Sequence, residues 1–292
     1  MRKTLSAFLV TAFMAASPVW AQDIKTQELG DGFYMLVGPG GNIGVSSGED
    51  GLFVIDDKFE RNGKEIIERL GEISDAPLRF VLNTHYHGDH TGSNAVMKTT
   101  DATIMAHENV RTRMGMRFEN KAFNRITEPT DPSLWPDLTY SEDATLHLNG
   151  QTIKAIHTPR AHTDGDSIVY FEEGNVLHMG DNFFNGMFPY IDVSGGGSIK
   201  GMIASHDRAL ALADENTKII PGHGPLATKA DLKRHRDMLQ TVMLRVQAGV
   251  DKGQSAADLV KVKPLADLSE FDGGFINAER MITLTHWSLS EG

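Results

Sequence analysis

Short apolar runs broken by glycine dominate the first half of the chain and predict β-strands. The runs lie at residues 33–37, 42–47, 52–55, 80–82 and 103–106. Runs of this length, rich in branched and aromatic side chains and bounded by turn residues, are typical of strands. Between them, Ile66, Ile67 and Leu70 share one face of a predicted helix at 63–71, and a second helix is predicted from His107 to about Phe118.

The second half repeats this style after a loop marked by Pro129, Pro132 and Pro136, which we interpret as the seam between two halves. Residues 145–148 and 152–157 flank Asn149-Gly150, a strong hairpin signal. Further strands are predicted at 167–171, 176–179 and 218–220, and helices at 199–213, 229–249, 256–260 and 277–289. Strand-rich halves, each followed by helices, predict an α/β sandwich with two sheets face to face and helices outside.

The N-terminus reads as a secretory signal peptide. Arg2-Lys3 precedes an apolar core that is too short for a permanent membrane span, and Val19-Trp20-Ala21 resembles a cleavage site. We therefore expect residues 1–21 to be removed on export to a bacterial periplasm. Residues 22–292 would form one soluble domain, with C-terminal helices from about residue 229.

Charge and cysteine content narrow the function. The chain has 28 basic and 39 acidic residues, and removing residues 1–21 takes away two basic residues and no acidic one. Such acidity argues against nucleic acid as a partner and favours a small-molecule substrate. The chain has no cysteine, so any metal would be held by nitrogen and oxygen ligands alone. Oligomeric state is left open.

The run His85-Tyr86-His87-Gly88-Asp89-His90 is the strongest chemical signal in the chain. It directly follows the predicted strand at 80–82, which places candidate ligands on a loop held by a sheet. His85 and His87 are two apart in extended backbone, so they point the same way and can share one metal ion. Asp89 and His90 diverge from that pair and can reach a second ion beside it.

Three later residues, His162, Asp181 and His223, each follow a predicted strand in a glycine-punctuated loop. Each is a weak signal alone, because a histidine or aspartate in a loop is more often a cap or a solvated side chain. Together they supply the further ligands that two metal ions would need beyond the first cluster. For the seven histidines that remain, ordinary packing or solvation is expected.

The series His85-x-His87-x-Asp89-His90, His162, Asp181 and His223 resembles that of the metallo-β-lactamase superfamily. The resemblance covers nearly the whole mature chain and implies the four-layer αββα fold. It also implies that His85, His87 and His162 hold one ion, that Asp89, His90 and His223 hold the other, and that Asp181 bridges them. Asp56 matches the carboxylate that steadies a ligating imidazole. Zinc is the expected metal, with iron or manganese as alternatives.

The implied activity is hydrolysis by a metal-bound hydroxide, with Asp89 as the catalytic residue that orients the nucleophile or shuttles its proton. A β-lactam or a related lactam or ester is the substrate expected first. A phosphatase or phosphodiesterase is one alternative, and a non-hydrolytic metal-binding relay protein of periplasmic quinoprotein systems is another. The apolar stretch 182–192 either lines the substrate site, through Phe184, Phe188 and Tyr190, or fills the core.

Overall fold

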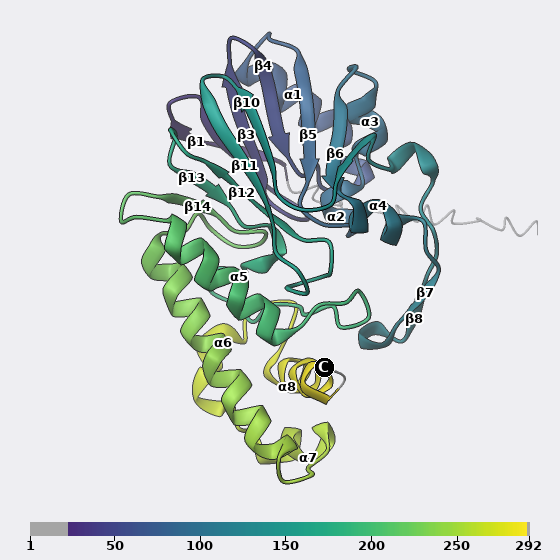
Figure 1. Ribbon diagram of the computed structural model, residues 1–292, viewed down its shortest axis with the longest axis vertical. Helices are drawn as coiled ribbons and strands as arrows, with labels where there is room; N and C mark the ends of the chain where they lie inside the picture. The colour runs from purple at the N-terminus through teal and green to yellow at the C-terminus, as the bar shows by residue number, and fades with distance from the viewer. Residues whose placement is uncertain (1–22, 291–292) are drawn as a thin grey trace, which may run out of the picture.

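Two β-sheets packed face to face, with helices on both outer faces, form the centre of the molecule (Figure 1). The computed structural model describes residues 23–290. The predicted signal peptide at 1–21 lies outside these residues. The layers are those of the expected αββα sandwich. Within the described residues, no helix combines the length and the apolar character that a membrane span requires.

The first sheet is formed by the N-terminal half. Its seven strands lie in the order β1 (Lys25–Gly30), β2 (Phe33–Val37), β3 (Ile43–Gly48), β4 (Gly51–Ile55), β5 (Leu78–Asn83), β6 (Thr103–His107) and β9 (Leu138–Tyr140). Strands β4, β5, β6 and β9 are parallel, so their carboxyl ends meet at one edge. The connecting helices are α1 (Gly63–Ile73), α2 (Gly88–Thr91), α3 (Asn94–Lys98) and α4 (Glu108–Met114).

The second sheet is formed by the C-terminal half. Its strands are β10 (Ala144–Leu148), β11 (Gln151–His157), β12 (Ser167–Phe171), β13 (Val176–His178) and β14 (Lys218–Ile220). Strand β12 is antiparallel to β11 and β13, and β14 is parallel to β13. Strands β11, β13 and β14 therefore run in the same direction. The helices of this half are α5 (Ile199–Leu212), α6 (Lys229–Val250), α7 (Ala256–Val262) and α8 (Ala278–Ser290).

Alternation along the strands divides the first sheet between two cores. Met35, Phe53 and Leu82 face the second sheet, whereas Val54 and Val81 face α1. On the second sheet, Ile156, Leu177 and Ile219 point outward against α5 and the start of α6, and a separate cluster joins α5, α6, α7 and α8. The period of two in these strands thus places one apolar layer between the sheets and one under each helical layer.

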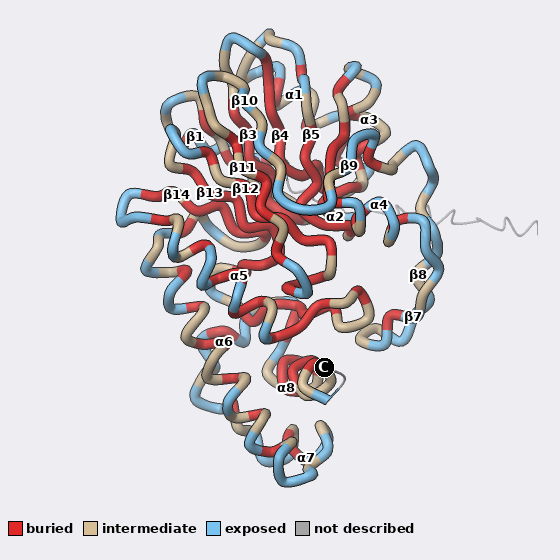
Figure 2. The backbone as a smooth tube through the Cα atoms, in the orientation of Figure 1, coloured by how far each residue is buried: buried red, intermediate tan, exposed pale blue. Residues whose placement is uncertain are grey.

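The sequence missed short elements. The helix expected from His107 to Phe118 ends at Met114, because Gly115 follows and Phe118–Asn120 (β7) pairs with Arg125–Thr127 (β8). Strands β1 and β9 and helices α2 and α3 were not predicted. Since β9 still belongs to the first sheet, the change of sheet falls after Tyr140 rather than in the proline-rich loop. Figure 2 shows the β7–β8 hairpin as a largely exposed arm beside the buried sheets.

Candidate metal centre

The candidate ligands follow strands that end at the same edge of each sheet. His85, His87, Asp89 and His90 come after β5, His162 after β11, Asp181 after β13, and His223 after β14. The structure brings all seven side chains together, in two groups of histidine and aspartate atoms that lie within 4.8 Å of one another inside each group. Each half of the chain therefore contributes to one His/Asp metal-binding cluster at the carboxyl ends of its strands.

The first group contains His85, His87 and His162. His87 Nδ1 lies 3.1 Å from His85 Nε2 and 2.9 Å from His162 Nε2. His85 and His162 are buried, and His87 faces the cavity described below. The short separations place three ring nitrogens around one point.

The second group contains Asp89, His90 and His223. Asp89 Oδ2 lies 3.4 Å from His223 Nε2 and 3.7 Å from His90 Nε2. His90 belongs to α2, a single turn for which His87 is the N-cap residue. This turn changes the backbone direction after His87, so Asp89 and His90 join the second group, as the sequence predicts, although the His90 ring centroid stays 4.2 Å from that of His85.

Asp181 lies between the two groups with one oxygen toward each. Its Oδ1 lies 3.1 Å from His90 Nε2 and 3.3 Å from His223 Nε2. Its Oδ2 lies 3.6 Å from His162 Nε2 and 3.8 Å from His85 Nε2. Gly222 permits this placement, because a Cβ at that position would lie 2.1 Å from Asp181 Oδ1.

The hydrogen bonds on the outer side of the rings show that the inner nitrogens suit a cation. His162 Nδ1 donates to the Tyr190 carbonyl at 2.7 Å, and His90 Nδ1 donates to Asp56 Oδ2 at 2.7 Å. With the outer nitrogen of each ring protonated, a neutral imidazole presents a lone pair inward. His90 Nε2 and Asp181 Oδ1 lie 3.1 Å apart and are buried, but neither forms a hydrogen bond of acceptable geometry. Converging lone pairs and an orphaned carboxylate oxygen are the donor set that a divalent metal ion requires.

Asp56 connects the ends of β4 and β5 to the second group. Its carboxylate accepts from the Thr84 backbone N–H at 2.7 Å, from the Thr84 hydroxyl at 2.8 Å and from His90 Nδ1. Thr84 Oγ1 in turn lies 3.0 Å from His85 Nδ1, so one buried carboxylate orients a ligand of each group. Asp56 has a φ of 63°, a left-handed backbone conformation that costs energy in a non-glycine residue.

Asp192 plays the corresponding part for His87, and sequence reasoning missed it. This fully buried carboxylate lies 2.9 Å from His87 Nε2 and also accepts from the Tyr86 hydroxyl. His87 is thereby held with Nδ1 directed at the first group. The only signal in the sequence is an acidic residue at the end of the apolar stretch 182–192, which does not distinguish an orienting carboxylate from a solvated one.

The pKa values of the ligands separate neutral histidines from charged groups. Burial lowers the pKa of His162 to about 4 and holds that of His85 well below its ordinary value, so both are neutral. Burial would also lower the pKa of His223, but Asp181 and Asp89 raise it to about 9. Burial would raise the pKa of Asp89, but His90 and His223 lower it to about 2. Burial would likewise lower the pKa of His90, but Asp181, Asp56 and Asp89 hold it well above its ordinary value. Metal binding must therefore displace a proton from both His90 and His223.

A cavity of about 720 Å³ opens onto the cluster. His87, Asp89, Asp181 and His223 form part of its wall, together with Phe184 and Tyr190. The remaining wall comes from the loop Gly38–Asn42, from Phe59, from the β7–β8 hairpin and from Phe275. The glycine-rich loop is fixed to both halves, because Gly41 N donates to Asp89 O and Asn42 N donates to Gly222 O.

One of the three expected lining residues is placed elsewhere. Phe184 stacks on His223, with ring centroids 5.0 Å apart, and Tyr190 lies 5.8 Å from His87. Phe188 does not line the cavity: it is 1% exposed and packs against Phe271 in the core under the C-terminal helices. The stretch 182–192 thus serves as wall and core at once, depending on which way each aromatic ring turns from an irregular loop.

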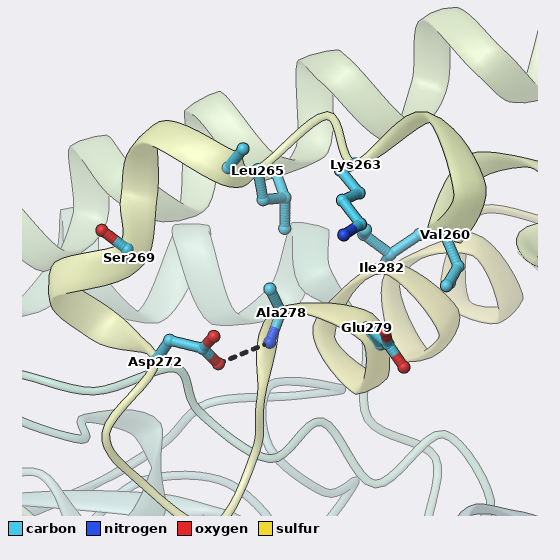
Figure 3. Close-up of a pocket in the computed structure, with 9 residues that line it drawn as sticks. Val260, Lys263, Leu265, Ser269, Asp272, Ala278, Glu279 and Ile282 are labelled. Atoms are coloured by element: carbon cyan, nitrogen blue, oxygen red, sulfur yellow. Dashed lines mark hydrogen bonds between the residues drawn. The ribbon is translucent and has the colours of Figure 1, made fainter.

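The seven other histidines stay outside the cluster. His107 and His157 stack on each other at 3.7 Å, and His206 pairs with His235 at 2.9 Å between α5 and α6. A second cavity, of about 190 Å³, lies between α7, the segment Ala266–Phe271 and α8 (Figure 3). Its labelled residues include Lys263, Asp272 and Glu279 but no histidine, and the Asp272 carboxylate is used to accept from Ala278 N.

Comparisons with known proteins agree with this geometry. The model of the metallo-beta-lactamase superfamily matches residues 29–223. A probable metallo-hydrolase, YqgX of Bacillus subtilis, is 26% identical over 166 residues, covering 56% of this chain and 76% of that protein. A hydroxyacylglutathione hydrolase of Nitrosococcus oceani is 30% identical over 146 residues, covering 49% of this chain and 47% of that protein. The chain thus matches about half the length of that relative.

Solved structures show the same fold at low identity. A metallo-beta-lactamase from Pontibacter korlensis superposes with a TM-score of 0.62 at 16% identity, covering 74% of this chain and 99% of that one. The sec-alkylsulfatase Pisa1 from Pseudomonas sp. gives a TM-score of 0.68 at 16% identity, covering 91% of this chain and 50% of that one. With the family match spanning both halves of the metal cluster, the chain belongs to the metallo-β-lactamase superfamily of metal-dependent hydrolases.

Proposed function

We propose that the protein is an exported hydrolase with two divalent ions, zinc in the first instance, that opens a lactam or a related ester. The observation that carries the dinuclear proposal is the position of Asp181, with Oδ1 toward His90 and His223 and Oδ2 toward His85 and His162. A carboxylate that faces two separate sets of ring nitrogens is arranged to bridge two ions rather than to hold one.

Each group would hold one ion, and the pair would supply Lewis acidity and lower the pKa of bound water toward neutrality. The chain's own residues position the rest. Asp89 lies at the cavity wall, and its lowered pKa of about 2 keeps the carboxylate ionised at neutral pH, so it can orient the nucleophile as a charged hydrogen-bond acceptor. Asp56 and Asp192 hold His90 and His87 in the orientation that directs their free nitrogens inward.

The substrate proposal rests on the cavity and on the relatives together. A volume of about 720 Å³ falls in the range that accommodates a small organic molecule. Relatives of similar sequence carry the name hydroxyacylglutathione hydrolase, which makes a thiolester a second candidate substrate besides a lactam or carboxylic ester. Export to a periplasm is proposed from residues 1–21 alone.

The test combines metal content with a panel of four substrates: the chromogenic lactam nitrocefin, a thiolester, a phosphodiester and a lactone. We expect nearly two ions per chain and lactam or ester turnover that a chelator abolishes. Turnover of the phosphodiester alone would replace the proposal with a phosphodiesterase. Two ions without turnover of any compound would favour a metal-binding relay protein.

Asp89→Asn supplies the mechanistic control. It should preserve the fold and reduce turnover by roughly two to four orders of magnitude, because the variant amide is neutral and replaces a charged acceptor that orients the nucleophile. A rate near that of the native protein would remove Asp89 from the mechanism. His157→Gln, which alters a half-buried histidine stacked on His107, should reduce turnover far less than His162→Gln.

A further inference from the structure

Arg125 gives the cavity a cationic side chain that the metal chemistry does not use. It is the only lysine or arginine among the described residues that line the cavity, and it lies in β8 of the hairpin that forms one wall. The chain as a whole carries a net charge of −11. The overall field therefore repels anions, and any recognition of an anionic substrate must come from local groups such as this one.

Arg125 has no carboxylate partner within residues 23–290. Its guanidinium lies 5.7 Å from the ring of Phe123, and the residue is exposed and lines the cavity. Arg117, at the other end of the same hairpin, forms an ion pair with Glu128 at 3.1 Å. Arg117, which does not line the cavity, is therefore neutralised by Glu128, whereas Arg125 is available to an incoming ligand.

Aromatic rings connect the metal ligands to Arg125. The ring of Tyr190 lies 5.8 Å from that of His87, and the ring of Phe123 lies 5.2 Å from that of Tyr190. Phe275 stacks on Phe123 at 5.3 Å and is 62% exposed, although aromatic side chains of this size are usually covered. The rings of Tyr190 and Phe123 thus offer an apolar surface between the metal ligands and the Arg125 guanidinium.

We propose that the substrate is an acyl compound with an apolar body that lies along Tyr190 and Phe123 and with a carboxylate that pairs with Arg125. The scissile bond would lie at the metal cluster, so this inference rests on the proposed hydrolase function. A guanidinium matches a carboxylate through two parallel hydrogen bonds, which makes Arg125 a determinant of specificity rather than of the chemical step.

Two esters with the same leaving group and acyl length test the inference with metal-loaded protein. They are the mono-4-nitrophenyl ester of octanedioic acid, which carries a terminal carboxylate, and 4-nitrophenyl octanoate, which is neutral. Arg125→Gln should raise KM for the anionic ester about tenfold, a loss of about 1.4 kcal/mol, and leave kcat unchanged. Both constants for the octanoate should stay as in the native protein.

Two further variants separate the specific role from a general charge effect. Arg125→Lys should recover part of the anionic preference, because the ammonium keeps the charge but loses the two parallel hydrogen bonds. Arg117→Gln removes one positive charge from the same hairpin, and it should behave as the native protein toward both esters. An equal KM change for both esters in Arg125→Gln, or a similar loss in Arg117→Gln, would overturn the inference.

Calorimetric binding of 4-phenylbutyrate and of its neutral amide gives a readout that does not require turnover. The native protein should bind the acid more tightly than Arg125→Gln by about the same tenfold factor, with no difference for the amide. If neither ester is hydrolysed but this difference is found, the hydrolase proposal fails and the anion site stands. If the acid binds equally to both proteins, the carboxylate is held elsewhere and the inference is wrong.

Discussion

Asp192→Asn should weaken the first metal group without unfolding the protein. In the native protein Asp192 Oδ2 accepts from His87 and from the Tyr86 hydroxyl, and Oδ1 accepts from the Gly195 N–H at 3.0 Å. All three neighbours are donors. An asparagine amide must therefore direct its own NH2 group at one of them, whichever way it turns.

The magnitude follows from this arrangement. The orientation that costs least directs the NH2 group at Gly195 N and keeps the amide oxygen toward His87. His87 then still has a hydrogen-bond acceptor, but that acceptor is neutral instead of charged. Replacing such an outer partner of a metal ligand usually costs about 10- to 100-fold in metal affinity, which is about 1.4 to 2.7 kcal/mol. We expect a loss in this range for the ion held by His85, His87 and His162, and little change for the other.

Competition with a chromophoric chelator, which resolves the two dissociation constants, measures the effect. Asp164→Asn is the matched control, since Asp164 lies in the loop after β11, pairs with Arg113 of α4, and forms no ion pair with a candidate ligand among residues 23–290. Both dissociation constants of Asp192→Asn within twofold of the native values would refute the reasoning. Weakening of the second ion alone would show that Asp192 acts through a route other than His87.

Three further outcomes follow from the same geometry. Gly41→Ala should lower metal affinity at least about tenfold in the chelator assay, because a Cβ there would lie 2.1 Å from the His90 ring; Gly71→Ala, where nothing lies within 4 Å, should not. Chelation should lower the melting temperature as well as abolish turnover, and added zinc should restore both; an unchanged melting temperature would show that the ions do not stabilise the fold. Burial lowers the pKa of His206 to about 4 and that of His235 well below its ordinary value. In the unfolded chain both histidines titrate near 6.5, so below that pH the unfolded state binds more protons than the folded state. The free energy of unfolding should therefore fall as pH drops from about 6.5 toward 4, and urea unfolding of metal-free His206→Gln should show a shallower fall; equal slopes would contradict the lowered pKa values.

The ligands could be predicted because local patterns determine them. His85 to His90 form one dense run after an apolar strand, and His162, Asp181 and His223 each follow a strand whose carboxyl end faces the same edge. His85 and His87 lie in one group, as the expected alternation predicts, although β5 ends at Asn83, before both of them. The two-sheet architecture follows from the same period, so the fold and the ligand positions depend on one signal.

The surroundings of the metals could not be predicted because they depend on long-range packing. Asp192 meets His87 from 105 residues away, and no local pattern marks it. The hairpin that carries Arg125 has two strands of three residues each, too short to show a period. Phe188 was misassigned because the loop around it is irregular, and sequence order does not tell which ring turns to the cavity.

The separation of the β7–β8 hairpin from the two sheets has a consequence for how the enzyme's substrate range can diversify. The metal ligands follow buried strands and are held by hydrogen bonds to other parts of the fold, whereas much of the hairpin is exposed (Figure 2). Exposed substitutions usually change stability by no more than about 0.5 kcal/mol. Mutational drift on this arm can therefore change which molecules are admitted while the reaction machinery is inherited intact. A library confined to its exposed residues Lys121, Asn124 and Arg125 is a practical starting point for directed evolution.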